Sequence, residues 1–303
     1  MKRKNNKILF SFTGALFFEV LFVLFSTTCP LWAKEFNEDM KSIKKNTSSS
    51  ASFQATWELF TDEPRAFAPI LANPREANIR LGFMLDNKGK SFWDLGFGGD
   101  LGLLSYKSPN WFFIATVRGL VAPRFAFFSK SFDLLNTDFL GGVAFGLKTN
   151  SWGGEVFVYH QSSHLGDEIL SRGERKRIDY SRETFQILIE QYFFSSLRVY
   201  SGLSYHIRAL PASLEGRFTI HGGGEYYLKK FFLPVFLALD MQAHQFHQWE
   251  PNISLQIGVE LGNPMKVLKR QRLFFELYYG FSNMGQYYNE RKVYILMGIG
   301  YNF

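Results

Sequence analysis

Residues 92–104 read FWDLGFGGDLGLL, and this stretch decides the fold. Its odd positions carry the large apolar side chains Trp93, Leu95, Phe97, Leu101 and Leu103. The even positions from 94 to 102 carry only Asp and Gly. Successive side chains of a β-strand point to opposite faces of the sheet. The alternation therefore predicts a strand with one apolar face and one polar face.

The same alternation recurs from residue 77 to the end of the chain. We count about twelve such segments, at 77–85, 92–104, 111–121, 137–148, 152–162, 178–193, 197–208, 217–228, 235–244, 252–262, 272–281 and 292–303. Most of them are about ten residues long, which is the length that a tilted strand needs to cross a bilayer. An even number of strands brings both ends of a barrel to the same side of the membrane.

The composition fits a membrane barrel better than a soluble protein. Of the 303 residues, 46% are hydrophobic, 34 are Phe and 26 are Gly. Mean hydropathy is close to zero, as expected where apolar and polar side chains alternate. A soluble β-sandwich, the alternative, would have to hide Phe-rich faces of nearly every strand. We therefore predict an all-β fold, a transmembrane antiparallel up-and-down β-barrel of about twelve strands.

The connections between the predicted strands differ in length on the two sides. With the N-terminal end in the periplasm, the periplasmic turns include TNS at 149–151 and FSS at 194–196. The outward loops include SHLGDEILSRGERKR at 163–177. Short periplasmic turns and longer outer loops are typical of outer-membrane barrels, so this asymmetry sets the predicted orientation.

The first residues predict export. Basic residues crowd the first seven positions, an apolar run follows at 8–25, and Ala33 is a suitable cleavage point for a signal peptide at 1–33. A retained membrane anchor is one alternative, because Glu19 interrupts the run. An acylated lipoprotein is another, because Cys29, the only cysteine, lies in this segment. Without residues 1–33 the net charge falls from +7 to about +4, and no nucleic-acid partner is expected.

The region before the barrel divides into two parts. Residues 34–56 are polar, with a serine run at 48–50, and are predicted to form a flexible periplasmic tail. Residues 57–76 contain three prolines and no sustained period, so they are predicted to form an ordered periplasmic lead-in. The barrel itself is expected to occupy residues 77–303.

The last predicted strand ends on an aromatic residue. One face carries Val293, Ile295, Met297, Ile299, Tyr301 and Phe303, and the other carries Gly298, Gly300 and Asn302. This end resembles the carboxy-terminal signature of outer-membrane barrels, whose last strand is read by the assembly machinery. The resemblance implies that Tyr301 and Phe303 form an assembly signal, that the barrel assembly machinery is a partner, and that the chain resides in the outer membrane.

The polar faces are expected to project charges of both signs into the barrel. They are Asp94, Asp100, Arg118, Asp138, Glu155, Arg182, Glu190, Arg198, Arg208, Asp240, Glu260 and Glu276. Charges in a low-dielectric interior are costly unless they are paired. We therefore predict a cross-linked polar network and a narrow or occluded lumen, with a narrow diffusion channel as the alternative.

One constellation could carry chemistry. The stretch YHQSSHLGDE at 159–168 places His160 and Ser162 two positions apart, so on a strand they share a face. If that face meets lipid, a nucleophile and a base lie at the outer-leaflet edge, where an acyl ester lies. Asp167, Glu168 or Asp179 could orient the histidine. In the other interpretation, His160 and Ser162 are interfacial polar residues that end a strand.

The His-x-Ser pair resembles outer-membrane phospholipase A and, more loosely, the lipid A deacylases, which also place His and Ser on a barrel wall. In the phospholipase family an H-x-S-N-G segment is followed by an Asn that orients the histidine. Here His160 and Ser162 match, and Ser163 stands where that motif has Asn. The resemblance implies a lipid-acyl hydrolase with His160 as base and Ser162 as nucleophile. No cofactor is predicted, and calcium is expected only in the hydrolase case.

The other histidines give weaker signals. His244 and His247 lie in an expected loop without a third ligand at a suitable spacing, so no metal site is predicted. His206 and His221 are expected to point inward and to be structural.

Two segments together are similar to a known family. FAPILANPRE at 67–76 and YHQSSHLGDE at 159–168 resemble the hallmark stretches of domain of unknown function family 1207, a set of exported bacterial proteins. The resemblance covers roughly residues 55–303 and implies no activity. The expected function is a structural or transport-related outer-membrane barrel, with the lipid-acyl hydrolase as the alternative. Outer-membrane lipids are expected partners, and the oligomeric state is left open.

Overall fold

The computed structural model describes residues 55–63, 65–129, 131–194, 196–211, 214, 216–228, 233–261 and 270–302. The predicted signal peptide (1–33), nearly all of the predicted tail (34–56) and the terminal Phe303 lie outside these residues. No helix within the described ranges is long and apolar enough to cross a membrane.

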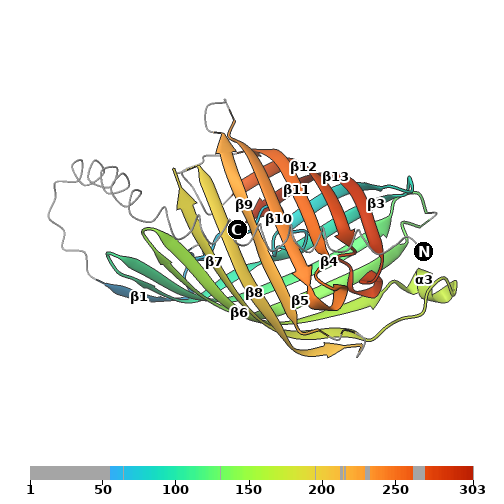
Figure 1. Ribbon diagram of the computed structural model, residues 1–303, viewed down its shortest axis with the longest axis horizontal. Helices are drawn as coiled ribbons and strands as arrows, with labels where there is room; N and C mark the ends of the chain where they lie inside the picture. Colours follow the sequence, from blue (N-terminus) through green and yellow to red (C-terminus); the bar gives the residue numbers. More distant parts are fainter. Residues whose placement is uncertain are drawn as a thin grey trace, which may run out of the picture. The chain divides into compact units, whose positions relative to one another are not determined.

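The described chain consists mostly of strands (Figure 1). They are β1 (Thr56–Leu59), β2 (Ile79–Asp86), β3 (Ser91–Lys107), β4 (Trp111–Ala126), β5 (Leu134–Thr149), β6 (Trp152–Leu165), β7 (Tyr180–Phe193), β8 (Leu197–Leu210), β9 (Phe218–Leu228), β10 (Val235–His244), β11 (Pro251–Leu261), β12 (Arg270–Phe281) and β13 (Arg291–Asn302). The described connections carry the α-helix α3 (Asp167–Ser171) and the 3-10 helices η1 (Gln245–His247) and η2 (Gly285–Tyr287).

The strands close into a barrel. From β2 to β13 each strand pairs antiparallel with the next, and β13 pairs with β2. The predicted all-β antiparallel barrel of about twelve strands is therefore confirmed. β1 lies outside this ring and pairs with the end of β3, with Thr56 opposite Lys107. In Figure 1 β1 lies at one end of the barrel and α3 at the other.

The alternation of side chains decides which face of each strand turns outward. On β13, Ile295 and Met297 are more than half exposed, whereas Tyr294 and Leu296 are at most 3% exposed. The inward face is crowded, because a Cβ at Gly298 would lie 2.8 Å from the ring of Phe274. An apolar outer surface and a filled interior follow from the same period of two.

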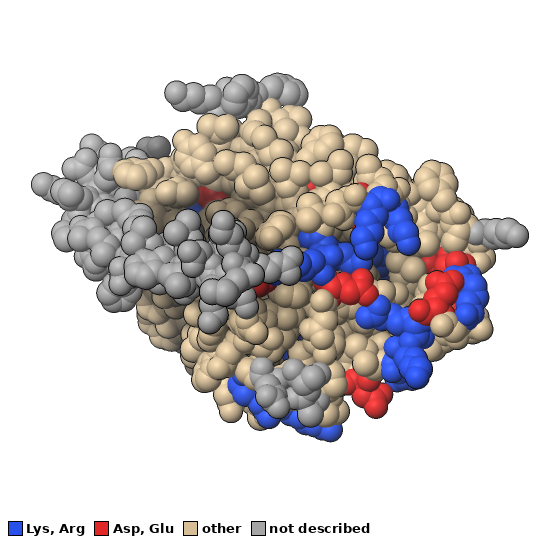
Figure 2. Space-filling model, turned by 45° about the vertical axis from the view of Figure 1, so that its right-hand side comes forward, with Lys and Arg blue, Asp and Glu red and all other residues tan. Residues whose placement is uncertain are grey.

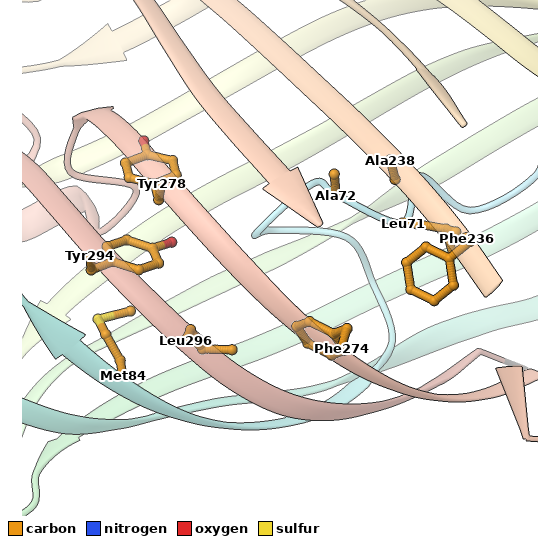
Figure 3. Packing of buried hydrophobic residues seen from close by; sticks show 9 residues of the cluster. All are labelled: Leu71, Ala72, Met84, Phe236, Ala238, Phe274, Tyr278, Tyr294 and Leu296. Carbon is orange, nitrogen blue, oxygen red and sulfur yellow. The ribbon is translucent and has the colours of Figure 1, made fainter. Parts of the chain in front are cut away.

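The lumen is filled by the chain that precedes the barrel. We call residues 65–78 the inner segment. Ala66, Phe67, Ile70, Leu71 and Ala72 are each at most 2% exposed. Figure 3 shows Leu71 and Ala72 beside Phe236 and Ala238 of β10, in one buried cluster with side chains of β12 and β13.

The predicted periplasmic lead-in therefore lies inside the barrel for most of its length, which corrects the expectation for residues 57–76. The reason is visible in its backbone contacts. Leu71 N–H donates to Glu225 at 2.9 Å, and Ala68 N–H donates to Glu190 at 3.2 Å. Arg198 donates to the carbonyls of Ala68 and Pro69 at 2.5 and 2.9 Å. Because side chains of the barrel wall satisfy its backbone, the segment needs neither strand pairing nor a hydrophobic period.

Charged side chains hold the inner segment in place. Arg65 contacts Glu76 at 2.5 Å within the segment and Asp100 of β3 at 3.4 Å. Arg75 reaches Asp138 of β5 at 3.2 Å. These side chains are at most 16% exposed, and charges that are so far removed from bulk water are costly unless they are paired.

The wall has its own pairs, as the sequence predicted. Arg118 contacts Asp100 at 2.7 Å and Glu155 at 2.8 Å, and Arg124 contacts Asp94 at 2.5 Å. The expectation of a cross-linked, occluded lumen agrees with this arrangement. The prediction was wrong for one residue of the expected inward set, because Arg208 is exposed. A register shift across from Glu183 and Thr184 changes the alternation of β8.

Candidate functional site

The predicted His-x-Ser pair lies on the outer wall of the barrel. On β6 the inward residues Phe157, Gln161 and Ser163 are at most 7% exposed. The His160 side chain, which alternates with them, is 50% exposed, and Ser162 is half-buried. The structure thus places both residues on the outward face, as the hydrolase hypothesis requires.

His160 contacts an acidic partner on the neighbouring strand. Its Nδ1 lies 2.8 Å from Oε1 of Glu183, and the two residues are directly opposite in the β6–β7 register. A carboxylate at Nδ1 favours the tautomer with the proton on that nitrogen and leaves Nε2 as a proton acceptor. This is the state that a general base needs.

Ser162 lies one pleat further along the same strand. Its register partners are Phe139 on β5 and Ser181 on β7. Alternate residues of a strand are about 7 Å apart. Among the described residues no hydrogen bond joins Ser162 to His160, so a side-chain rotation is needed to bring Oγ to Nε2.

The three residues lie at the edge of an apolar band. Below them on the same outward faces are Val158 on β6 and Phe185, Ile187 and Ile189 on β7, between 37% and 43% exposed. Beyond them lies the end of the barrel that carries α3. In Figure 2, in which the right-hand side of Figure 1 comes forward, Lys, Arg, Asp and Glu side chains gather there. An apolar wall ending in polar and charged groups is typical of a membrane–water boundary.

The carboxylate that contacts His160 was not predicted from the sequence. Asp167 and Glu168 lie in α3, and Asp179 precedes β7; none of the three is a described partner of His160. Glu183 stands 23 residues after His160, across a long loop. The signal that could have found it is the β6–β7 register, and a loop of this length leaves the register open.

Four of the other histidines lie inside the barrel, whereas His164 on β6 is exposed. His206 Nδ1 is 3.0 Å from the Thr184 hydroxyl, and His221 Nε2 is 2.6 Å from Asp240. They help to line a cavity of about 150 Å³ together with His244 and His247. In the described chain no group of three or more His, Cys, Asp or Glu is arranged to hold a metal ion. Burial lowers the pKa of His247, in η1, to about 4.

The predicted assembly signal is described only in part. Tyr301 lies near the end of β13, opposite Gln271 on one side and Ile79 on the other. Phe303 lies outside the described residues.

Several solved structures are similar to this chain. Outer membrane phospholipase A from Escherichia coli aligns over 77% of this chain and 93% of its own, with 14% identity and a TM-score of 0.50. The calcium-bound phospholipase dimer from Salmonella typhi gives the same coverage and identity with a TM-score of 0.49. The KdgM porin aligns over 75% of this chain and 99% of its own, with 10% identity and a TM-score of 0.41.

At 14% identity, the likeness to the Escherichia coli phospholipase shows the fold and not the activity. A search of curated protein sequences gives no match. The model of a family described as proteins of unknown function, DUF1207, matches residues 30–303. With nearly all of its length matched, the chain belongs to the DUF1207 family.

Proposed function

We propose that this barrel resides in the outer membrane and hydrolyses acyl esters of lipids, with Ser162 as nucleophile, His160 as base and Glu183 as the acid that orients it. The observation that carries the proposal is the 2.8 Å contact between His160 Nδ1 and Glu183 on the outer wall. The buried lumen charges hold the inner segment against the barrel wall. Within the described chain, the half-exposed His160–Glu183 pair, beside Ser162, makes no comparable contact with the inner segment.

The reaction follows from the roles of the three groups. Ser162 Oγ attacks the ester carbonyl carbon while His160 Nε2 takes the hydroxyl proton. Glu183 stabilises the imidazolium that forms. The tetrahedral intermediate collapses, the proton passes from His160 to the leaving alcohol, and an acyl-serine remains. A water molecule, deprotonated by the same nitrogen, then releases the fatty acid and restores Ser162.

The site lies where such esters are found. The acyl ester bonds of an outer-leaflet lipid sit at the boundary between hydrocarbon and headgroup. His160 and Glu183 mark the corresponding edge of the apolar wall, above Val158 and Phe185. A substrate can therefore reach Ser162 from the membrane without entering the barrel.

The location carries further proposals. Residues 1–33 act as a signal peptide for export, and Tyr301 and Phe303 act as the signal for the barrel assembly machinery. Calcium is proposed only as an activator of the hydrolase, and no step above passes through it. The rival function is a structural or transport-related barrel. The inner segment, fastened to the wall at Glu190 and Glu225, gives more support to a structural role than to a diffusion channel.

Adjacent serines provide a matched test. Purified protein in phospholipid–detergent micelles, with and without calcium, is expected to release fatty acid. Ser162→Ala and His160→Ala should each abolish release, and the double variant should be hardly worse than either. Ser163→Ala is the control, because Ser163 points inward to Asn136 at 2.9 Å.

Heat-modifiable migration on gels checks that every variant is a folded barrel. If wild-type protein releases no fatty acid from phospholipids or lipid A, the hydrolase proposal fails. Full activity of Ser162→Ala would place the nucleophile elsewhere.

A further inference from the structure

An irregularity in β8 turns an arginine toward the outside of the barrel. His206 is 3% exposed and inward, and Ile207 is 56% exposed and outward. Regular alternation would turn Arg208 inward, but it is exposed as well. Ala209 packs against a buried cluster of Tyr180, Leu214 and Tyr288. Ile207 is the extra residue of a bulge, since Glu183 pairs with Arg208 while Thr184 pairs with His206. Bulges re-aim side chains and are common beside active sites.

The bulge is held by a second arginine. Arg217 Nη1 donates to the carbonyls of His206 and Ile207 at 3.0 and 2.7 Å. The backbone N–H of His206 donates to the carbonyl of Arg217 at 2.7 Å. These bonds satisfy backbone groups that the interrupted ladder leaves without strand partners. The outward turn of Arg208 is therefore a built feature of the wall.

The bulge aligns Arg208 with the proposed active site. Arg208 is the register partner of Glu183, and Glu183 is the register partner of His160. Directly opposed side chains on neighbouring strands have Cβ atoms about 5 Å apart. Three adjacent strands thus carry Arg208, Glu183 and His160 at one level of the outer wall.

The charge of Arg208 is not used within the described protein. Arg208 forms no ion pair within 4.0 Å with any residue that the structure describes. Oε1 of its register partner Glu183 contacts His160 instead. On the other side of His160, the β5 position is Gly141, where an added Cβ would meet nothing within 4 Å. Next to Glu183, the site is therefore flanked by a guanidinium that has no ion-pair partner among the described residues, and on the β5 side it is flanked by open space.

We propose that Arg208 binds the phosphate of the substrate, so that the enzyme acts on phosphate-bearing acyl lipids and disfavours neutral esters. A planar guanidinium can donate two parallel hydrogen bonds to a phosphate. Lipid phosphates lie just outside the ester bonds, at the level of the headgroups. This inference rests on the proposed hydrolase and adds its substrate class and the residue that selects it.

A pair of substrates separates this role from catalysis. Dioctanoylphosphatidylcholine and dioctanoylglycerol, in the same neutral-detergent micelles, differ in the phosphate-bearing headgroup. For Arg208→Ala we expect KM to rise about tenfold or more with the phosphate-bearing lipid, as for loss of a hydrogen bond to a charged group. With dioctanoylglycerol, KM should stay within twofold of its wild-type value, roughly the error of such comparisons. Arg208→Lys should restore part of the loss, since one ammonium replaces the bidentate guanidinium.

Two further measurements make the result decisive. Lys88→Ala, which removes an exposed cation in the β2–β3 loop, is the matched control. It should leave KM unchanged for both lipids. The Ser162→Ala protein is expected to bind micelles that contain dioctanoylphosphatidylcholine without hydrolysing the lipid. The double variant Ser162→Ala, Arg208→Ala should bind the same micelles more weakly.

Equal losses on both substrates would show that Arg208 acts through Glu183 and would overturn the inference, leaving the hydrolase in place. Unchanged KM and binding would overturn it as well. If wild-type protein hydrolyses neither of the two lipids, the proposed function is overturned, and this inference with it.

Discussion

The lumen and the outer wall at β6–β8 use the same residue types in opposite ways. In the lumen, Arg198 is 1% exposed and lies between Glu190 at 2.7 Å and Glu225 at 2.9 Å. On the wall, His160 and Glu183 have side chains that are 50% and 38% exposed and share a single described hydrogen bond.

Burial explains the difference. A buried charge is costly unless it is matched, and Arg198 donates to two carboxylates and two carbonyls, so its guanidinium has little bonding capacity left for a ligand. A half-exposed group keeps water as an alternative partner and can exchange it for a substrate. The Arg198 cluster therefore maintains the architecture, whereas the charges on the wall remain accessible to a ligand.

The largest effect is expected from breaking the lumen network. Arg198→Ala removes the only positive charge among the described residues that is shown to contact both Glu190 and Glu225, and it removes a donor from the carbonyls of the inner segment. Breaking a buried ion pair in this way should lower the free energy of unfolding by about 3–5 kcal/mol. The measurement is the temperature at which the folded band disappears on a gel. Arg208→Ala, the same change on the wall, should leave that temperature unchanged; equal shifts for both variants would contradict the comparison.

Two glutamates on β7 should separate activity from stability. Glu183→Ala removes the partner of His160 and should lower the rate of fatty-acid release about 100-fold or more. As a surface change, it should alter stability by no more than about 0.5 kcal/mol. Glu190→Ala should do the reverse, because Glu190 is fully buried and binds Arg198. Comparable activities of the two folded variants would remove Glu183 from the site.

A smaller effect tests whether the inner segment occupies the lumen. A Cβ at Gly146 of β5 would lie 2.8 Å from the Cβ of Ala66. Gly146→Ala should therefore destabilise the barrel by about 1–3 kcal/mol, as overpacking does. Gly141→Ala, on the outward face of the same strand, has open space around the new methyl group. Equal unfolding temperatures for the two variants would show that Ala66 does not pack there.

The fold could be predicted from the sequence because its cause is local. Alternation in stretches such as 92–104 is a property of neighbouring residues, and the structure has β3 at Ser91–Lys107. The outward position of His160 follows from the same period. Each of these needs only the direction of successive side chains.

The features that were missed depend on contacts between distant residues. The inner segment lies in the lumen because Glu190 and Glu225 satisfy its backbone, more than 100 residues away. Glu183 meets His160 through a register that the intervening loop does not specify. Arg208 faces outward because one extra residue shifts the period of β8. Periodicity alone contains none of this information.

The most direct test of the central claim is covalent labelling of the wall serine. An alkyl sulfonyl fluoride reacts with a serine whose hydroxyl is activated by a neighbouring base. We expect peptide mass spectrometry of the labelled folded barrel to place the adduct on Ser162, with labelling lost in His160→Ala and strongly reduced in Glu183→Ala. An adduct on another serine, or labelling of Ser162 that persists in His160→Ala, would contradict the account.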